Sequence, residues 1–185
     1  MTRRTFIAID IWPGENMLRA ASVVRNLYSS SRMRWARLDP AHITLAFLGE
    51  TSPAQVETVS QLLQQRLGAT GSVTIGVTGF GSFGRRGNPS VMWLGVNGSD
   101  RLTALHAAVN EIAMEAGFNI ESRTFKPHIT LGRVSKFSGE PGPGAMPEWI
   151  RNSMIQETEV AELVFYESIL KPDGPEYVAI RRVSL

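Results

Sequence analysis

The chain has 185 residues, of which 43 % are hydrophobic and 19 % charged, and its formal net charge is +2. This composition suits one globular domain and excludes a chain that is disordered throughout, because it offers ample apolar surface to bury. The absence of cysteine excludes disulfides, thiolate metal sites and cysteine nucleophiles. Arginine supplies 16 of the 19 basic side chains, which suits a phosphate-bearing ligand, although GC-rich codons explain the same bias.

The apolar runs are all short. None approaches the roughly 18 residues that a membrane-spanning helix needs. The first run, residues 5–9, ends at Asp10 and is too short for the core of a secretory signal. We therefore expect a cytoplasmic protein that has no membrane partner.

Helices and strands alternate along the sequence, and several strands are joined by connections short enough for hairpins. Runs of β-branched and aromatic residues predict strands, and apolar residues at helical spacing predict helices. One helix opens with Ser52 as its cap and Pro53 as its first residue. In chain order we expect a strand at 5–9, a helix at 15–28, strands at 35–38 and 42–48, a helix at 53–67, strands at 73–78 and 91–96, a helix from the cap at 97–100 to Gly117, and strands at 125–134, 159–166 and 177–183. This order favours an α+β fold with antiparallel pairs over a doubly wound parallel sheet.

Two glycine-rich segments are predicted to be loops. Residues 138–147 contain three glycines and three prolines. Residues 79–84 match the G-x-G-x-x-G pattern of dinucleotide-binding folds, but the residues that follow include Gly87 and Pro89 and cannot open the helix that such a site requires. We therefore expect no nucleotide cofactor and interpret 79–84 as a loop.

The sequence contains an internal repeat. The tetrapeptide His-Ile-Thr-Leu occurs at 42–45 and again at 128–131, and each copy closely follows a proline. Two of the three histidines belong to these copies, whereas His106 lies in a helical apolar pattern and is interpreted as structural. In a strand, His and Thr two residues apart share one face, while Ile and Leu share the other. Two copies on neighbouring strands would present two imidazoles and two hydroxyls around one cavity.

This set of side chains suits the opening of a cyclic phosphodiester. Two imidazoles on opposite sides of a phosphorus atom can act as acid and base near neutral pH, because the free histidine pKa is about 6.5. The hydroxyls of Thr44 and Thr130 can donate to the non-bridging oxygens, so that no metal is required. A single His-x-Thr is usually structural, but two identical copies favour catalysis by His42 and His128.

The two motifs and their flanks resemble the two-histidine (2H) phosphoesterases, and most closely the bacterial and archaeal RNA 2′,3′-cyclic phosphodiesterases of the 2′-5′ RNA ligase family. The resemblance covers nearly the whole chain and is clearest at residues 6–10, 35–50, 91–95, 125–133 and 163–168. It implies a single 2H phosphoesterase domain over residues 1–185, made of two intertwined lobes with pseudo-two-fold symmetry. Each lobe would have an antiparallel sheet with helices outside, and the motifs would face each other in a central cleft.

The resemblance also implies a reaction. The terminal 2′,3′-cyclic phosphate of an RNA, with tRNA halves among the candidates, would be hydrolysed to a 2′-phosphate by a monomer without metal or cofactor. RNA ends would also be joined reversibly through a 2′-5′ bond without ATP. In this scheme His42 protonates the leaving 3′ oxygen, His128 accepts the proton of water, and Thr44 and Thr130 hold the phosphate.

Three further residues are candidates for substrate binding. Arg133 stands five residues after His128, where family members often carry an arginine, and a bend after Gly132 would turn it toward a phosphate or a base. Phe6 and Trp35 can stack on a base, although packing in the core is the more usual fate of each. Phe47, at the equivalent place after His42, is predicted to lie in the core.

Two other functions stay open. One is a 2H phosphodiesterase that acts on a small cyclic nucleotide or on a 2′-5′ oligonucleotide. The other is a non-catalytic RNA-binding module on the same fold, which the intact His and Thr of both motifs argue against.

Overall fold

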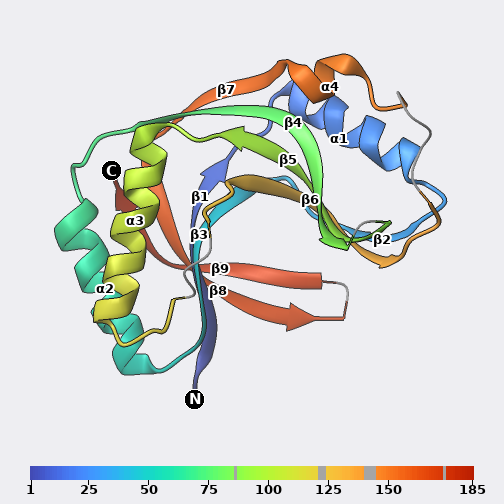
Figure 1. Ribbon diagram of the computed structural model, residues 1–185. Coiled ribbons are helices and arrows are strands. Elements are labelled where there is room, and N and C mark those ends of the chain that lie inside the picture. The colour runs from blue at the N-terminus through green and yellow to red at the C-terminus, as the bar shows by residue number, and fades with distance from the viewer. Residues whose placement is uncertain (86, 121–123, 140–144, 173) are drawn as a thin grey trace.

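The strands form two antiparallel sheets, which with the helices confirm the predicted α+β class (Figure 1). The computed structural model describes residues 1–85, 87–120, 124–139, 145–172 and 174–185. The first sheet has the order β3-β1-β8-β9, with β1 (Arg3–Ile11), β3 (Ala41–Thr51), β8 (Glu162–Lys171) and β9 (Gly174–Ser184). The second sheet has the order β2-β6-β5-β4-β7, with β2 (Arg32–Trp35), β4 (Val73–Arg85), β5 (Asn88–Asn97), β6 (His128–Lys136) and β7 (Met154–Val160).

The helices lie outside the two sheets. Helices α2 (Pro53–Leu67) and α3 (Asp100–Glu115) pack on each other and contact β9 and β3, whereas α1 (Glu15–Leu27) and α4 (Glu148–Asn152) lie against β7 (Figure 1). The predicted start of α2 is confirmed, because Ser52 and Gln55 form a capping box ahead of Pro53. None of the helices in the described residues is long and apolar enough to cross a bilayer.

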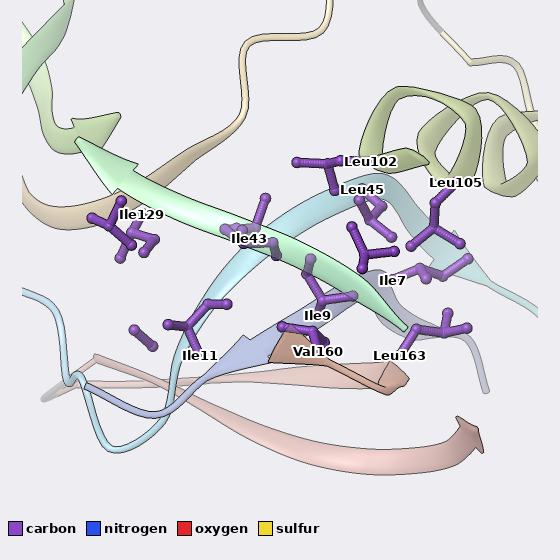
Figure 2. Close-up of a cluster of buried hydrophobic side chains, with 14 of the residues drawn as sticks. Ile7, Ile9, Ile11, Ile43, Leu45, Leu102, Leu105, Ile129, Val160 and Leu163 are labelled. Atoms are coloured by element: carbon purple, nitrogen blue, oxygen red, sulfur yellow. The ribbon is translucent and has the colours of Figure 1, made fainter. Parts of the chain in front are cut away.

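Buried apolar side chains from both sheets form one continuous core behind the motifs. Figure 2 shows Ile43 and Ile129, the second residues of the two tetrapeptides, among these side chains, and Leu102 and Leu105 of α3 in the same cluster near Leu45. Ile43 and Ile129 are 0 % and 1 % exposed. The core therefore fixes each motif strand from the side opposite its histidine.

The glycine-rich segment at 79–84 is part of β4, so the prediction of a loop there is wrong. Gly81 pairs with Trp93 of β5, and a Cβ on Gly81 would overlap the Trp93 indole. Gly79, at a register shift of the ladder, has a φ of +72°, which favours glycine. One glycine therefore allows close packing and the other allows a bulge within a strand. The resulting glycine-rich composition is the same as that of a loop.

Two strand boundaries also differ from the prediction. The strand expected at 35–38 lies at Arg32–Trp35, and Leu38 is buried in the irregular segment that precedes the turn at 39–40. The strand expected at 159–166 is two strands: the chain leaves the second sheet at the end of β7 and enters the first sheet with β8, on either side of Ala161. Much of the loop predicted at 138–147 falls on 140–144, outside the described residues.

Candidate active site

The two tetrapeptides lie on β3 and β6, strands of different sheets that contact each other where the sheets meet (Figure 1). In both copies the isoleucine and leucine are buried, while His42, Thr44, His128 and Thr130 are partly exposed on the opposite face. The predicted alternation is therefore confirmed in both strands. Each strand presents one imidazole and one hydroxyl on the face turned away from the core.

Both motifs are followed by the same β-bulge. The residue after the threonine, Leu45 on β3 and Leu131 on β6, has no partner on the neighbouring strand. Because a bulge reverses the alternation beyond it, the fifth residue after each histidine returns to the histidine face. These residues are Phe47, which is 51 % exposed, and Arg133, which is also exposed. The prediction of Phe47 in the core is wrong, and the bend that turns Arg133 lies at Leu131 rather than after Gly132.

Aromatic rings surround His42. The Phe6 ring lies 5.4 Å from the imidazole, and Tyr177 of β9 meets the imidazole edge-to-face at 5.1 Å. Tyr166 stacks on Phe6 at 5.2 Å, and Phe6 is only 3 % exposed. Phe6 therefore packs against His42 and Tyr166, and its burial fits the core packing that the sequence analysis gave as its more usual fate.

A buried carboxyl lies next to His42 along the sheet. Asp10 is the cross-strand neighbour of His42, and its Oδ2 accepts a hydrogen bond of 2.7 Å from the Tyr166 hydroxyl. Arg182 lies 3.8 Å from the same oxygen. Burial raises the Asp10 pKa, and the Tyr166 hydroxyl and the Arg182 charge offset part of that increase. This network ties β1, β8 and β9 together directly beneath one imidazole.

His128 is oriented by the backbone. Its Nδ1 donates a hydrogen bond of 2.8 Å to the carbonyl oxygen of Lys126. Because a carbonyl only accepts, the neutral imidazole carries its hydrogen on Nδ1 and leaves the Nε2 lone pair free. Phe83 meets the ring edge-to-face at 4.8 Å, and the Trp93 ring lies 6.0 Å away.

The titration of the two histidines is linked. Burial, and next the positive charge of His128, lower the pKa of His42 to about 4. Burial also lowers the pKa of His128; the Arg133 charge adds to this effect, and the hydrogen bond to Lys126 opposes it. Burial raises the pKa of Tyr177, and the Arg133 charge works against that increase. Charges on the second sheet, those of His128 and Arg133, thus shift the pKa values of His42 and Tyr177 on the first sheet. This is expected if both imidazoles border one space.

Trp35 lies away from the histidines. It pairs with Gly132, and a Cβ on this glycine would be 3.0 Å from the Trp35 ring. Gly132 is on the opposite face of β6 from its neighbour Arg133, so the indole lies on the core side of the sheet, where the Arg25 guanidinium covers it at 5.4 Å. Trp35 therefore lies on the face opposite the histidines, which fits the core packing that the sequence analysis gave as its more usual fate.

The third histidine, His106, lies on α3 and belongs to neither motif. The His106 ring stacks on Phe125 at 3.8 Å, and Asn110 is hydrogen-bonded to its Nε2 at 3.0 Å. These contacts hold the segment that leads into β6 against α3, which supports the structural interpretation of His106.

The sequence analysis missed the rings of Tyr177, Phe83 and Trp93. Phe83 and Trp93 become visible only when 79–84 is read as a strand, because Phe83 then shares a face with Gly81. Tyr177 lies in a strand that was predicted, but nothing in the local pattern indicates its partner on β3.

The site offers imidazoles, hydroxyls and guanidinium groups. Arg133 lies on the histidine face of β6, and Arg4 of β1 lies over the Phe47 ring, 4.9 Å from its centroid. Within the described part of the chain, no group of three or more His, Cys, Asp or Glu side chains is arranged to hold a metal ion. The donors present suit an anion that is held by hydrogen bonds and by positive charge.

Residues 15–142 match the sequence profile of the 2′-5′ RNA ligase superfamily. The chain belongs to this superfamily. It is 34 % identical over 177 residues to the RNA 2′,3′-cyclic phosphodiesterase of Thermotoga maritima, a match that covers 94 % of this chain and 91 % of the relative. The RNA 2′,3′-cyclic phosphodiesterase of Archaeoglobus fulgidus is 29 % identical over 180 residues, covering 96 % of this chain and 98 % of the relative.

Among solved structures, the crystal structure of E. coli LigT complexed with 3′-AMP superposes with a TM-score of 0.77 at 26 % identity, over 100 % of this chain and 99 % of that one. The fold that the sequence resemblance implied, with two antiparallel sheets and outer helices, is thereby confirmed. As a member of the 2′-5′ RNA ligase superfamily with phosphodiesterase relatives over its whole length, the chain is a phosphodiesterase of the 2H type.

Proposed function

We propose that this phosphodiesterase hydrolyses the 2′,3′-cyclic phosphate at the end of an RNA to a 2′-phosphate, without a metal ion. The observation that carries the proposal is the pair of His-x-Thr faces from two sheets, whose imidazoles lie close enough for the charge of one to lower the pKa of the other. The names of the Thermotoga and Archaeoglobus relatives support the substrate. The LigT structure with 3′-AMP supports a nucleotide end as the bound group.

The reaction is a displacement at phosphorus. The oxygen of water forms a bond to phosphorus while the bond between phosphorus and the 3′ oxygen breaks. His128 takes the proton of the water, and His42 gives its proton to the 3′ oxygen. The products are a 2′-phosphate and a 3′-hydroxyl, and the two histidines exchange their protonation states.

The surroundings of the two histidines support this division of roles. The bond from His128 to Lys126 leaves Nε2 as a proton acceptor, and the Arg133 charge opposes a second proton on His128. His42 is neutral at pH 7 in the unliganded protein, since its pKa is about 4. The negative charge of a bound phosphodiester raises the pKa of both imidazoles. The Arg133 charge opposes this increase at His128, whereas the charge that lowers the pKa of His42 is that of His128 itself.

The remaining groups hold the substrate. Thr44 and Thr130 donate their hydroxyl hydrogens to the non-bridging oxygens, and Arg133 adds a charge-assisted hydrogen bond. Phe47 and Tyr177 are 51 % and 43 % exposed on the first sheet. Arg4 lies over the Phe47 ring at 4.9 Å, and the rings together with this guanidinium offer surfaces for the terminal base.

The proposal includes ligation of RNA ends at the same site. When the 5′-hydroxyl of a second RNA takes the place of water, the same displacement forms a 2′-5′ phosphodiester, and the reverse reaction cleaves it. The energy comes from the cyclic phosphate itself, so no ATP is needed. Halves of a cleaved tRNA are RNAs of the required kind.

The test compares three substrates: an oligoribonucleotide with a 2′,3′-cyclic phosphate end, a 2′,3′-cyclic mononucleotide, and a 2′-5′-linked oligonucleotide. We expect turnover of the first to a 2′-phosphate product. Turnover of only the small molecules or of only the 2′-5′ linkage would refute the substrate assignment, and binding of RNA without turnover would indicate a non-catalytic module.

The histidines are tested by H42Q and H128Q. Each should lower kcat by about 10²–10⁴-fold, the usual worth of a general acid or base. The matched control is H106Q, which should keep the activity of the wild type. Full activity in excess chelator is expected, and a loss that divalent metal restores would contradict the metal-free mechanism.

A further inference from the structure

Beyond Thr130, β6 carries two more cations on the face of His128. The bulge after Thr130 brings Arg133 to this face, and a second bulge at Ser135 does the same for Lys136. Both side chains are exposed. The histidine face of β6 therefore presents His128 and Thr130 first, and then the positive charges of Arg133 and Lys136.

The edge strand β2 adds a second row (Figure 1). Arg34 pairs directly with Arg133, and Arg32 pairs directly with Lys136. Directly paired residues of antiparallel strands share a face, so the four cations form two rungs on the histidine face. We call Arg32, Arg34, Arg133 and Lys136 the basic array.

The four side chains of the basic array are exposed and carry charges of the same sign. Arg32 and Arg34 are exposed like the two cations of β6, and none of the four takes part in an ion pair within the described residues. Like charges that face each other across a ladder destabilise it. Two such rungs in succession fit a surface that binds a negatively charged partner.

We propose that Arg32, Arg34 and Lys136 of the basic array bind backbone phosphates of the RNA on the 5′ side of its terminal nucleotide, beyond Arg133 at the cyclic phosphate. This inference rests on the proposed function, because the cyclic phosphate between His42 and His128 fixes the 3′ end of the chain there. All other phosphates of the same RNA lie on its 5′ side. The basic array follows the phosphate site along β6, so these phosphates can bind to it as the RNA leaves the site.

The length of the array favours an oligonucleotide over a single phosphate. Lys136 lies six residues beyond Thr130, which is about 20 Å along a strand and less across the two bulges, so it lies beyond the reach of a mononucleotide held at Thr130. Three of the four cations are arginines, whose planar fork suits phosphate oxygens. The array contains no base-reading pattern, so it binds RNA of any sequence.

The consequence is a preference for longer substrates. For the wild type, kcat/KM should rise from a 2′,3′-cyclic mononucleotide to a hexanucleotide with the same cyclic end, mainly through a lower KM. The gain should fall with rising salt, because each phosphate contact on a single strand adds about 0.7 to the slope of log affinity against log salt.

The test is the triple variant Arg32→Gln, Arg34→Gln, Lys136→Gln, which leaves Arg133 in place. We expect the ratio of kcat/KM between hexanucleotide and mononucleotide to fall by about tenfold or more, with kcat for the hexanucleotide kept. The control is Arg181→Gln, which removes an exposed charge of β9 that pairs with the core residue Phe165. It should keep the ratio of the wild type.

Binding measured without turnover separates this inference from the proposed function. The probe is a fluorescent hexanucleotide that ends in a 2′-phosphate, followed by anisotropy at two salt concentrations. The triple variant should bind it more weakly and with a smaller salt slope than the wild type. An unchanged ratio and unchanged binding in the triple variant would overturn the basic array, whereas a wild type that binds the probe but hydrolyses no cyclic phosphate would overturn the proposed function alone.

Discussion

His42 and His128 lie in identical tetrapeptides, each followed by a bulge at the same position, yet their surroundings differ. Around His42 the first sheet supplies aromatic rings and the buried Asp10 network. Around His128 the second sheet supplies a backbone acceptor and the Arg133 charge, with further cations beyond. The comparison teaches that the repeated motif sets the positions of the two imidazoles, while neighbouring residues that are not repeated set the pKa and the hydrogen bonds of each.

The equivalence of the two halves is tested most strongly at the threonines. Thr44→Val and Thr130→Val keep the side-chain shape but remove the hydroxyl, and each should lower kcat/KM by about 10²-fold, the usual loss for one donor to a developing charge. Steady-state hydrolysis of the cyclic-phosphate oligonucleotide measures this, with the exposed helical Thr58→Val as control. A loss confined to one threonine would show that the phosphate lies against one sheet only.

The difference between the halves is sharpened at the fifth residue after each histidine. Arg133→Gln should lower kcat/KM by about tenfold at low salt, and by less at high salt, because it removes a charge-assisted bond to phosphate. Phe47→Ala should raise KM by about fivefold at any salt, because it removes a stacking surface. Equal salt dependence in the two variants would contradict this division between charge and stacking.

A smaller effect is expected from the network beneath His42. Tyr166→Phe removes the hydroxyl that donates to Asp10, and the loss of this partly buried bond should lower the free energy of unfolding by about 1–2 kcal/mol. Because the network supports the sheet rather than the substrate, kcat should change by less than about threefold. Chemical denaturation and kinetics on the same variant measure both quantities. A large kcat loss with unchanged stability would instead place the network in the reaction.

The sequence was sufficient for the features that local chemistry dictates. The alternation within each motif, the buried Ile43 and Ile129, and the Ser52 cap follow from strand periodicity and capping, and all three are confirmed. The cytoplasmic location, the monomeric state and the extent of the domain stay predictions.

The predictions that were wrong concern features that depend on the pairing of strands distant in the sequence. The face of Phe47 and Arg133 is set by bulges that appear only when β3 and β6 pair with their neighbours. Trp35 could not be placed without the register of β2 on β6. The 79–84 segment was misread because a glycine under an indole and a glycine in a loop have the same local signature.

The most direct test of a shared site is the titration of the His42 imidazole, followed by NMR of its Cε1–H in the wild type and in His128→Gln. The variant removes a charge that lowers the pKa of His42, while the burial that accounts for the larger part of the shift remains. The His42 pKa should therefore rise from about 4 in the wild type but stay below 6.5. An unchanged pKa would mean that the two imidazoles do not border the same space, and would contradict their joint action on one phosphate.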